Sequence, residues 1–262
     1  MSRILAIANQ KGGVGKTTTC VNLGASLAAT RRRVLIVDLD PQGNATMGCG
    51  VNKNELDASS CDVLLGESLI EETIVALDNG MWLLPGNNDL VAAEVGLLQA
   101  EDRERRLRQV LELVRNDFDF ILIDCPPSLN MLTINALSAA DGVIIPMQCE
   151  YYALEGLSSL LETIERVRAT VNPRLQVEGL LRTMFDPRNN LANQVAAQLT
   201  DHFGDRVYNS VIPRNVRLAE APSHGLSALQ YDKNSRGAVA YLTLAGEIIR
   251  RQKKQNAANA NQ

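Results

Sequence analysis

The stretch of sequence that decides the fold is Asn9-Gln10-Lys11-Gly12-Gly13-Val14-Gly15-Lys16-Thr17-Thr18. It lies between a short apolar segment, residues 3–8, and an alanine- and leucine-rich helical pattern, residues 15–30. A glycine-rich turn between a strand and a helix presents backbone N–H groups and the positive end of the helix dipole to an anion. A solvated lysine in an ordinary glycine turn is the alternative interpretation. The strand-to-helix setting favours a phosphate-binding loop.

The loop predicts a nucleotide and a metal ion as ligands. Lys16 is expected to reach the β- and γ-phosphates of ATP, and the Thr17 hydroxyl is expected to bind Mg²⁺. The expected nucleotide contacts in the loop are Lys11, Gly12, Gly13, Val14, Gly15, Lys16, Thr17 and Thr18.

Apolar segments and helical patterns alternate along the rest of the chain. Strands are expected at residues 3–8, 33–37, 120–123, 142–146 and 176–183, and helices at 101–115, 129–139, 153–170, 191–203 and 237–252. This alternation predicts an α/β fold of the P-loop NTPase type, a doubly wound, mostly parallel sheet with helices on both faces. Residues 49–88 show the least regular pattern. We expect a single domain over residues 1–254 and a polar flexible tail over 255–262.

Composition limits the classes of protein to consider. The chain has 262 residues, 45% of them hydrophobic but only 4% aromatic, which suits a core of aliphatic parallel strands. The net charge is −4, so any nucleic-acid binding must come from a local patch. Five cysteines without paired metal-ligand spacing, and no signal-peptide pattern, favour the cytoplasm. No stretch approaches the roughly 18 apolar residues of a membrane span.

Carboxylates follow two of the expected strands. Asp124 ends one apolar strand and is expected to act on magnesium through bound water, and Asp38 at the end of another is expected to share that role. In a doubly wound sheet both would converge with the glycine-rich loop at the carboxyl ends of the strands. The two histidines have no metal-pair spacing, so no zinc is predicted.

The loop departs from the usual phosphate-loop pattern, and that departure carries a resemblance. Gln10 stands where the usual pattern has glycine, and Lys11 follows it. Lys-Gly-Gly-Xaa-Gly-Lys-Thr resembles the deviant loop of the ParA/MinD group. Residues 38–46, 124–128, 149–156 and 213–225 look like those of chromosomal ParA/Soj proteins, and the match covers roughly residues 3–250.

The resemblance implies an ATPase whose active site is completed by dimerisation. It implies that Lys11 crosses a nucleotide-sandwiched homodimer to touch the partner's ATP, although a contact within its own subunit remains an alternative. It implies that Asp40 positions the attacking water, where an ordinary turn or capping residue would otherwise be the simpler interpretation. It also places Pro213, Arg214 and Asn215 near the adenine.

The resemblance further implies a role in DNA segregation. Arg188 and Arg217 match positions assigned to contacts with the DNA backbone, although each alone would more simply be a solvated or ion-paired surface residue. The expected partners are nonspecific double-stranded DNA and a ParB-type centromere-binding protein that stimulates hydrolysis. The expected location is the cytoplasm, in association with the nucleoid.

Two other kinds of ATPase share this loop. A membrane-positioned regulator like MinD needs a C-terminal amphipathic helix, and residues 247–254 offer only two adjacent isoleucines. We therefore expect no membrane partner. An electron-transfer ATPase like the nitrogenase iron protein needs cysteines around an iron–sulfur cluster. Cys125 and Cys149 lack the surrounding motifs and are interpreted as structural thiols.

Overall fold

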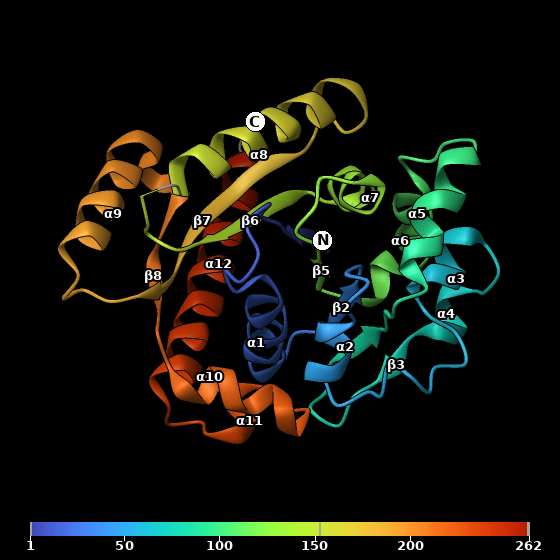
Figure 1. Cartoon of the computed structure of the whole chain (residues 1–262), viewed down its shortest axis with the longest axis horizontal. Helices are drawn as coiled ribbons and strands as arrows, with labels where there is room; N and C mark the ends of the chain where they lie inside the picture. Colours follow the sequence, from blue (N-terminus) through green and yellow to red (C-terminus); the bar gives the residue numbers. More distant parts are fainter. Residues whose placement is uncertain (1, 152, 261–262) are drawn as a thin grey trace.

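The central element of the protein is a twisted eight-stranded sheet, seen in a computed structural model that describes residues 2–151 and 153–260 (Figure 1). The strand order is β3-β4-β2-β5-β1-β6-β7-β8, and within the described residues every pairing is parallel except that of β3 with β4. The strands are β1 Arg3–Ile7, β2 Val34–Asp38, β3 Val75–Ala76, β4 Trp82–Leu84, β5 Phe120–Asp124, β6 Gly142–Met147, β7 Gln176–Phe185 and β8 Val207–Pro213.

Helices cover both faces of this sheet. They are α1 Lys16–Ala29, α2 Asn44–Gly48, α3 Ser60–Leu65, α4 Ile70–Thr73, α5 Leu90–Gln99, α6 Arg106–Val114, α7 Met131–Ala139, α8 Ala153–Thr170, α9 Asn190–Phe203, α10 Val216–Glu220, α11 Ala228–Tyr231 and α12 Arg236–Ala260. Residues of α3 and α5–α9 pack in one hydrophobic core, and residues of α1, α11 and α12 pack in a second core on the opposite face. The expected α/β fold with a doubly wound, mostly parallel sheet is confirmed.

The central strands form because they are apolar on both faces. All residues of β2, β5 and β6 are buried, as continuous aliphatic runs between two helical layers must be. In the register of the sheet, Asp38 of β2 and Ile7 of β1 both lie opposite Asp124 of β5. The carboxyl ends of three adjacent strands therefore bring the loop after β1 and two carboxylates to one edge of the sheet.

Residues 49–88 have the expected irregular character, because α3, α4, β3 and β4 are all short and are joined by turns and loops. Several other elements differ from the sequence expectations. The helix expected at 101–115 begins only at Arg106, since Asp102 has a positive φ of 55° and residues 101–105 form turns. Helix α5 and strand β8 were not expected. The described part of the chain contains no helix that is both long and apolar enough to cross a membrane.

The end of the chain also differs from the expected boundary. Helix α12 continues past the expected end at Gln252 to Ala260, so most of the segment expected as a flexible tail is helical. Asn261 and Gln262 lie outside the described residues. The division into one domain and a short tail stays a prediction.

Candidate active site

The phosphate-loop segment is anchored to two neighbouring strands. The Asn9 side chain donates a hydrogen bond to the Pro146 carbonyl at 2.7 Å and accepts one from the Lys11 N–H at 2.9 Å. The Thr183 hydroxyl of β7 donates to the Val14 carbonyl at 2.8 Å. Neither Asn9 nor Thr183 was singled out from the sequence, because their partners are more than a hundred residues away. These bonds fix the loop across β1, β6 and β7.

Glycines give the loop its path. Gly13 and Gly15 have positive φ values of 74° and 87°, a region in which a side chain is strained. A Cβ at Gly12 or Gly13 would meet nothing within 4 Å, so open space lies beside the loop. Helix α1 starts at Lys16, and its first N–H groups have no intrahelical partner. The loop is thus an open cradle at a helix N-terminus, suited to an anion.

Lys16 lies at the bottom of this cradle. It is only 6% exposed, and its ammonium donates to the Lys11 carbonyl at 3.3 Å. Burial lowers the pKa of Lys16, while the nearby Asp124 and Asp40 carboxylates act in the opposite direction. A buried ammonium with one weak protein contact retains donors for a phosphate.

Asp124 is the unusual group of the site. Its side chain is fully buried, and neither carboxylate oxygen has a hydrogen-bond partner among the described residues. Burial and the Asp38 carboxylate raise the pKa of Asp124 well above its usual value, whereas the nearby Thr17 hydroxyl and Lys16 lower it. The Thr17 hydroxyl is near enough to act on the carboxylate, but its geometry is not that of a hydrogen bond. An orphaned carboxylate of this kind calls for a cation or water.

Asp38 lies beside Asp124 but is fully engaged within the chain. One of its oxygens accepts from the Thr46 N–H at 2.8 Å and the Thr46 hydroxyl at 2.7 Å, and the other accepts from the Asp40 N–H at 3.2 Å. Burial raises the pKa of Asp38 to about 6, although these hydrogen bonds oppose the shift. The geometry fits a residue that shapes the loop between β2 and α2. Thr46 is a member of the site that the sequence did not indicate.

Asp40 follows on the same loop. It is 7% exposed, and it accepts from the Gln42 N–H at 3.0 Å, as a residue in a tight turn does. Its charge nevertheless acts on both Lys16 and Asp124, which places the carboxylate in the same cluster. The structure therefore brings together Lys16, Thr17, Asp38, Asp40 and Asp124, as expected from the strand order.

The described residues fit a magnesium site of the phosphate-dependent kind. Among residues 2–151 and 153–260, no group of three or more His, Cys, Asp or Glu side chains is arranged to hold a metal ion. Mg²⁺ bound with a nucleotide uses one or two protein ligands, phosphate oxygens and water. The Asp124 carboxylate and Thr17 hydroxyl supply that kind of incomplete donor set.

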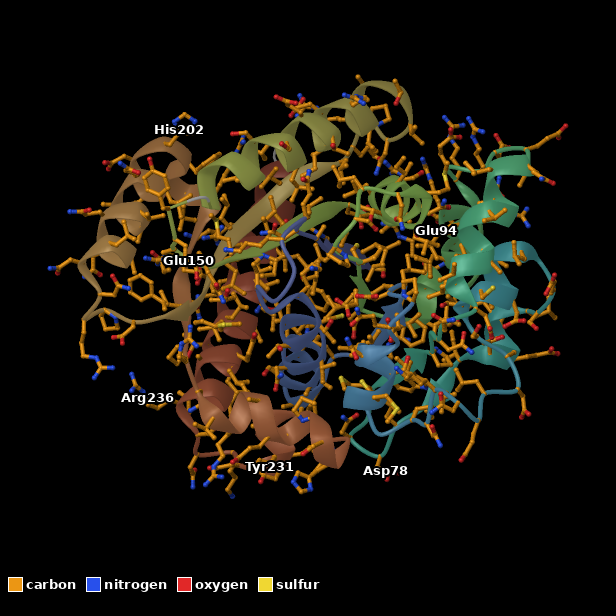
Figure 2. The ribbon with its side chains drawn as sticks, in the orientation of Figure 1. Asp78, Glu94, Glu150, His202, Tyr231 and Arg236 are labelled. Atoms are coloured by element: carbon orange, nitrogen blue, oxygen red, sulfur yellow. The ribbon has the colours of Figure 1, made fainter. Side chains whose placement is uncertain are left out.

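Lys11 points to a partner within its own chain. Its ammonium forms an ion pair with Glu150, at 2.5 Å, in the loop after β6 (Figure 2). The two side chains are 44% and 50% exposed. Sequence reasoning did not identify Glu150 as a partner. An exposed pair of this kind contributes at most about 1 kcal/mol and can be exchanged for another contact.

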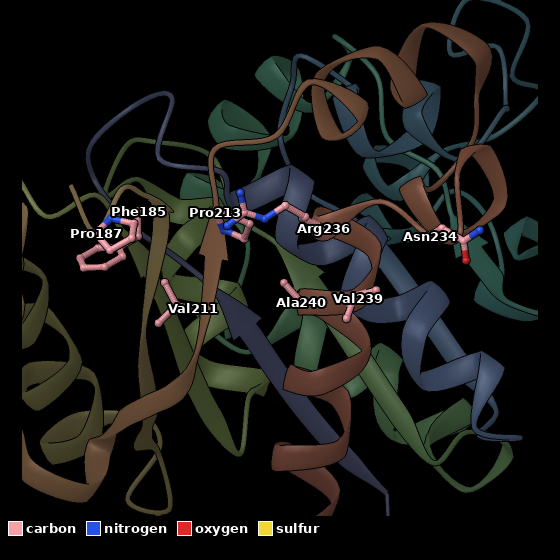
Figure 3. Close-up of a pocket in the computed structure, with 8 residues that line it drawn as sticks. All are labelled: Phe185, Pro187, Val211, Pro213, Asn234, Arg236, Val239 and Ala240. Atoms are coloured by element: carbon pink, nitrogen blue, oxygen red, sulfur yellow. The ribbon is translucent and has the colours of Figure 1, made fainter. Parts of the chain in front are cut away.

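Three shallow depressions at the carboxyl ends of β7 and β8 share Phe185. The largest, about 470 Å³, is mainly apolar, and Figure 3 shows Arg236 extended toward Pro213 within it. Pro213 and Arg214 both line a second depression of about 390 Å³. The Asn215 side-chain oxygen instead caps α10 by accepting from the Leu218 N–H. Of the three predicted adenine contacts, two line an open depression and the third is used in capping.

The two arginines predicted to contact DNA are exposed and ion-paired. Arg188 pairs with Asp186 at 2.8 Å, and its side chain is 88% exposed. Arg217 pairs with Glu220 at 2.7 Å and with Asp232 at 3.3 Å. Arg188 lies in the turn before α9, and Arg217 lies on α10. Arg188 lines the same depression as Arg214, which precedes Arg217 by three residues.

Cys125 and Cys149 are buried, and burial raises the pKa of both thiols. Cys125 is fully buried, and its thiol donates to the Ile123 carbonyl. These surroundings agree with structural thiols.

Comparison with known proteins gives this arrangement a family. A family model described as an AAA domain matches residues 2–177. The chain is 51% identical over 258 residues to the chromosome partitioning protein ParA of Caulobacter vibrioides NA1000, covering 97% of each protein. It is 52% identical over 249 residues to the sporulation initiation inhibitor protein Soj of Bacillus subtilis 168, covering 95% of this chain and 98% of Soj.

The fold also matches solved structures that contain a nucleotide and a metal ion. A Mycobacterium smegmatis structure, described as cobyrinic acid a,c-diamide synthase with a bound ATP analog and magnesium, superposes with a TM-score of 0.86. It shares 41% sequence identity, and the match covers 97% of this chain and 96% of that one.

Proposed function

The chain belongs to the ParA/Soj family of chromosome-partitioning ATPases, and on that basis we propose that it hydrolyses ATP with Mg²⁺ to drive DNA segregation. In this proposal ATP binding produces a homodimer that holds nonspecific double-stranded DNA. A ParB-type centromere-binding protein then stimulates hydrolysis and causes release. The chain acts in the cytoplasm, in association with the nucleoid.

The observation that carries the ATPase proposal is the buried, unpartnered Asp124 carboxylate beside Lys16 and Thr17. Thr17 would hold Mg²⁺ directly, and Asp124 would hold it directly or through water. When bound, Mg²⁺ neutralises negative charge that develops on the phosphate oxygens. Lys16 would donate to the β- and γ-phosphates from the bottom of the loop. The hydrogen bonds of Asp38 support a role in positioning the catalytic loop, and its predicted role as a metal ligand remains to be tested.

Hydrolysis needs a water molecule aimed at the γ-phosphorus. Asp40 would accept a hydrogen bond from that water and hold it in line with the bond to ADP. The water oxygen forms a bond to phosphorus as the bond to the β-phosphate oxygen breaks, giving ADP and phosphate. The Asp38 carboxylate accepts a hydrogen bond from the Asp40 N–H, and this bond supports the backbone position of Asp40.

Dimerisation would recruit Lys11. Its ion pair with Glu150 occupies the ammonium in the single chain, and the exposure of both side chains makes exchange inexpensive. In the dimer Lys11 would leave Glu150 for the ATP of the facing subunit. Additional positive charge near the transferring phosphoryl group would then lower the barrier only after assembly.

DNA binding would use exposed arginines from both subunits. Arg188 and Arg217 each pair with a carboxylate of this chain, and such exposed pairs can exchange for DNA phosphates. Dimerisation doubles the number of these contacts, and each phosphate neutralised releases counterions. Binding should therefore depend on ATP and weaken steeply with salt despite the net charge of −4.

The proposal is tested by binding to a nonspecific duplex with ATP, with ADP and without nucleotide, across a salt series. Arg217→Glu should lose most of the affinity, whereas Arg174→Glu, at an exposed arginine outside the proposed contacts, should lose little. ATP-dependent, salt-sensitive binding with this difference supports the proposal. Formation of an ATP dimer without DNA binding at low salt would contradict the segregation function and leave a dimerising ATPase.

A further inference from the structure

Helix α5 exposes an apolar stripe. Leu90, Ala93 and Leu97 point into the core, where α5 packs on α3. The stripe on the other side consists of residues at helical spacing i, i+4 and i+7, and their exposed fractions are 50% for Val91, 61% for Val95 and 55% for Leu98. A cluster of large apolar side chains on the outside of a helix is a signal for an interaction surface.

One carboxylate lies within this stripe. Glu94 is three residues after Val91 and four before Leu98, so helical spacing places it on their face of the helix. It has no hydrogen-bond or ion-pair partner among the described residues. Partial desolvation raises the pKa of Glu94, as expected for a carboxylate bordered by apolar groups. The α5 face, defined as Val91, Glu94, Val95 and Leu98, thus combines three apolar contacts with one unpaired negative charge.

The α5 face lies between an acidic segment on its N-terminal side and a short basic one on its C-terminal side, where Arg103 donates to the Leu98 carbonyl at 3.2 Å and Arg105, Arg106 and Arg108 follow. Residues 52–102, here called the acidic lobe, contain eleven carboxylates and one basic residue, Lys53, a net charge of −10. The whole chain has a charge of −4, so the remaining residues carry a net charge of +6. Figure 1 shows α3, α4 and α5 gathered at one end of the molecule, on the side opposite α9. The carboxylates are Glu55, Asp57, Asp62, Glu67, Glu71, Glu72, Asp78, Asp89, Glu94, Glu101 and Asp102.

Charge selects among the possible occupants of this surface. DNA phosphates and anionic lipids would be repelled by the acidic lobe. A second copy of the chain that used the same face would bring two lobes of charge −10 together. A basic amphipathic helix matches both the apolar stripe and the negative charge. Its apolar side can cover the valines and leucine, while its cations pair with Glu94 and with the carboxylates of the acidic lobe.

We propose that the α5 face is the docking site for a basic amphipathic helix of the protein that stimulates ATP hydrolysis. This rests on the proposed function, and it assigns the stimulating partner a specific surface of this chain. The partner's apolar side chains contact Val91, Val95 and Leu98, and a lysine or arginine of the partner pairs with Glu94.

Hydrogen bonds connect the acidic lobe to the catalytic loop. The Ser60 hydroxyl at the start of α3 donates to the Asp38 carbonyl at 2.8 Å. The Gly86 N–H donates to the Thr46 hydroxyl at 2.8 Å, and that same hydroxyl donates to the Asp38 carboxylate. A Cβ at Gly86 would lie 2.5 Å from the Asp38 carbonyl oxygen, so the two segments are in close contact. A partner that shifts α3 and α5 therefore acts on the loop that carries Asp40.

The experiment compares two variants of the α5 face with two matched controls. Val95→Asp and Glu94→Lys change the face, while Leu113→Asp and Glu162→Lys make the same kinds of change at exposed helical positions on α6 and α8. Basal ATP hydrolysis, ATP-dependent DNA binding and thermal unfolding are measured for each purified chain. ATP hydrolysis is then measured with the ParB-type protein of the same cell.

A second assay measures docking directly. The probe is a fluorescent synthetic helix with leucine at positions i, i+3, i+4 and i+7 and arginines on its flanks, and binding is followed by fluorescence anisotropy. In the proposal, both α5 variants bind the probe at least tenfold more weakly than wild type and lose at least fivefold of the stimulation. The two controls retain binding and stimulation within twofold, and all chains retain basal hydrolysis and DNA binding.

The outcomes separate this inference from the proposed function. Equal stimulation and equal probe binding in all variants would overturn the α5 assignment. Loss of self-association in the α5 variants, with stimulation unchanged, would show that a second copy covers the face and would also overturn it. If the ParB-type protein fails to stimulate wild-type chain, the proposed function is wrong, and the probe assay still decides whether the face accepts a basic helix.

Discussion

The phosphate-binding loop takes its backbone path from residues that are neighbours in the sequence, and hydrogen bonds to two distant residues, Pro146 and Thr183, only anchor it to the sheet. The acidic lobe instead takes its shape from contacts between short, distant segments. In the loop, Gly13 and Gly15 set the backbone path and α1 begins directly afterwards. In the lobe, a two-residue strand and helices of four and six residues are held by packing on the sheet. Local geometry leaves a readable motif, and geometry set by packing does not.

The two regions should respond differently to mutation, and the largest difference is expected at Lys16. Lys16→Ala removes the buried ammonium at the bottom of the loop and should reduce ATP hydrolysis by roughly 10²- to 10³-fold, the cost of losing one strong transition-state contact. Phosphate release with Mg²⁺ and ATP measures the effect. Lys233→Ala, at an exposed lysine, is the control and should hydrolyse ATP normally.

Asp124→Asn should stabilise the nucleotide-free protein while it impairs function. The wild-type carboxylate is buried without a hydrogen-bond partner beside Asp38, so removing its charge relieves desolvation and repulsion. The free energy of unfolding should rise, but by less than the desolvation of Asp124 alone would give, because the buried Lys16 ammonium loses a neighbouring negative charge. Denaturant titration in EDTA measures the change. Mg²⁺ with ATP should stabilise wild type but not the variant. A variant less stable than wild type in EDTA would contradict this account of Asp124.

Thr46→Val tests the connection between the two regions. The change removes the hydroxyl that bonds both the Asp38 carboxylate and the Gly86 N–H, leaving a buried N–H without a partner. The free energy of unfolding should fall by about 2 kcal/mol. ATP hydrolysis should fall more than ATP binding, because Asp38 supports the loop that carries Asp40. Thr243→Val, at an exposed helical threonine, should leave both ATP hydrolysis and stability nearly unchanged.

Ser59→Ala should affect the stability of the acidic lobe much more than the phosphate site, because the hydrogen bond from Ser60 to the Asp38 carbonyl is retained. Ser59 caps α3 by accepting from the Cys61 N–H, and it forms a reciprocal capping box with Asp62. Loss of this cap should lower the free energy of unfolding by about 1 kcal/mol, measured by thermal or denaturant unfolding. Basal ATP hydrolysis should stay within twofold of wild type. A large loss of basal hydrolysis would contradict this expectation, because it would mean that catalysis depends on the cap of α3.

The sequence was sufficient to predict most of the central sheet. Strands β1, β2, β5 and β6 are unbroken aliphatic runs, so their existence and their ends at Asp38 and Asp124 follow from hydrophobic pattern alone. Strand β8 was not recognised, because tyrosine, asparagine and serine interrupt its apolar pattern. Helix α5 was not recognised from the sequence, because its own residues are apolar on nearly every side of the helix. The hydrophobic pattern therefore shows no clear helical period.

The candidate site was predictable where it follows from strand ends and not where it depends on distant partners. Lys16, Asp38, Asp40 and Asp124 converge because neighbouring parallel strands end at one edge. The pairing of Lys11 with Glu150, and the use of the Asn215 oxygen in capping α10, depend on side-chain geometry that no spacing rule contains. The ion pairs of Arg188 and Arg217 likewise depend on side-chain geometry and could not be predicted from the sequence.

The central claim is that this chain is a Mg²⁺-dependent ATPase in which Asp40 acts on the attacking water and not on ATP binding. The most direct measurement is single-turnover phosphate release by wild type and Asp40→Ala, with Mg²⁺ and with EDTA, together with the mass of each ATP-bound species by sedimentation. The account predicts release by wild type only with Mg²⁺, and an Asp40→Ala chain that forms ATP dimers but releases phosphate at least 10²-fold more slowly. Normal phosphate release by Asp40→Ala, or release by wild type in EDTA, would contradict it.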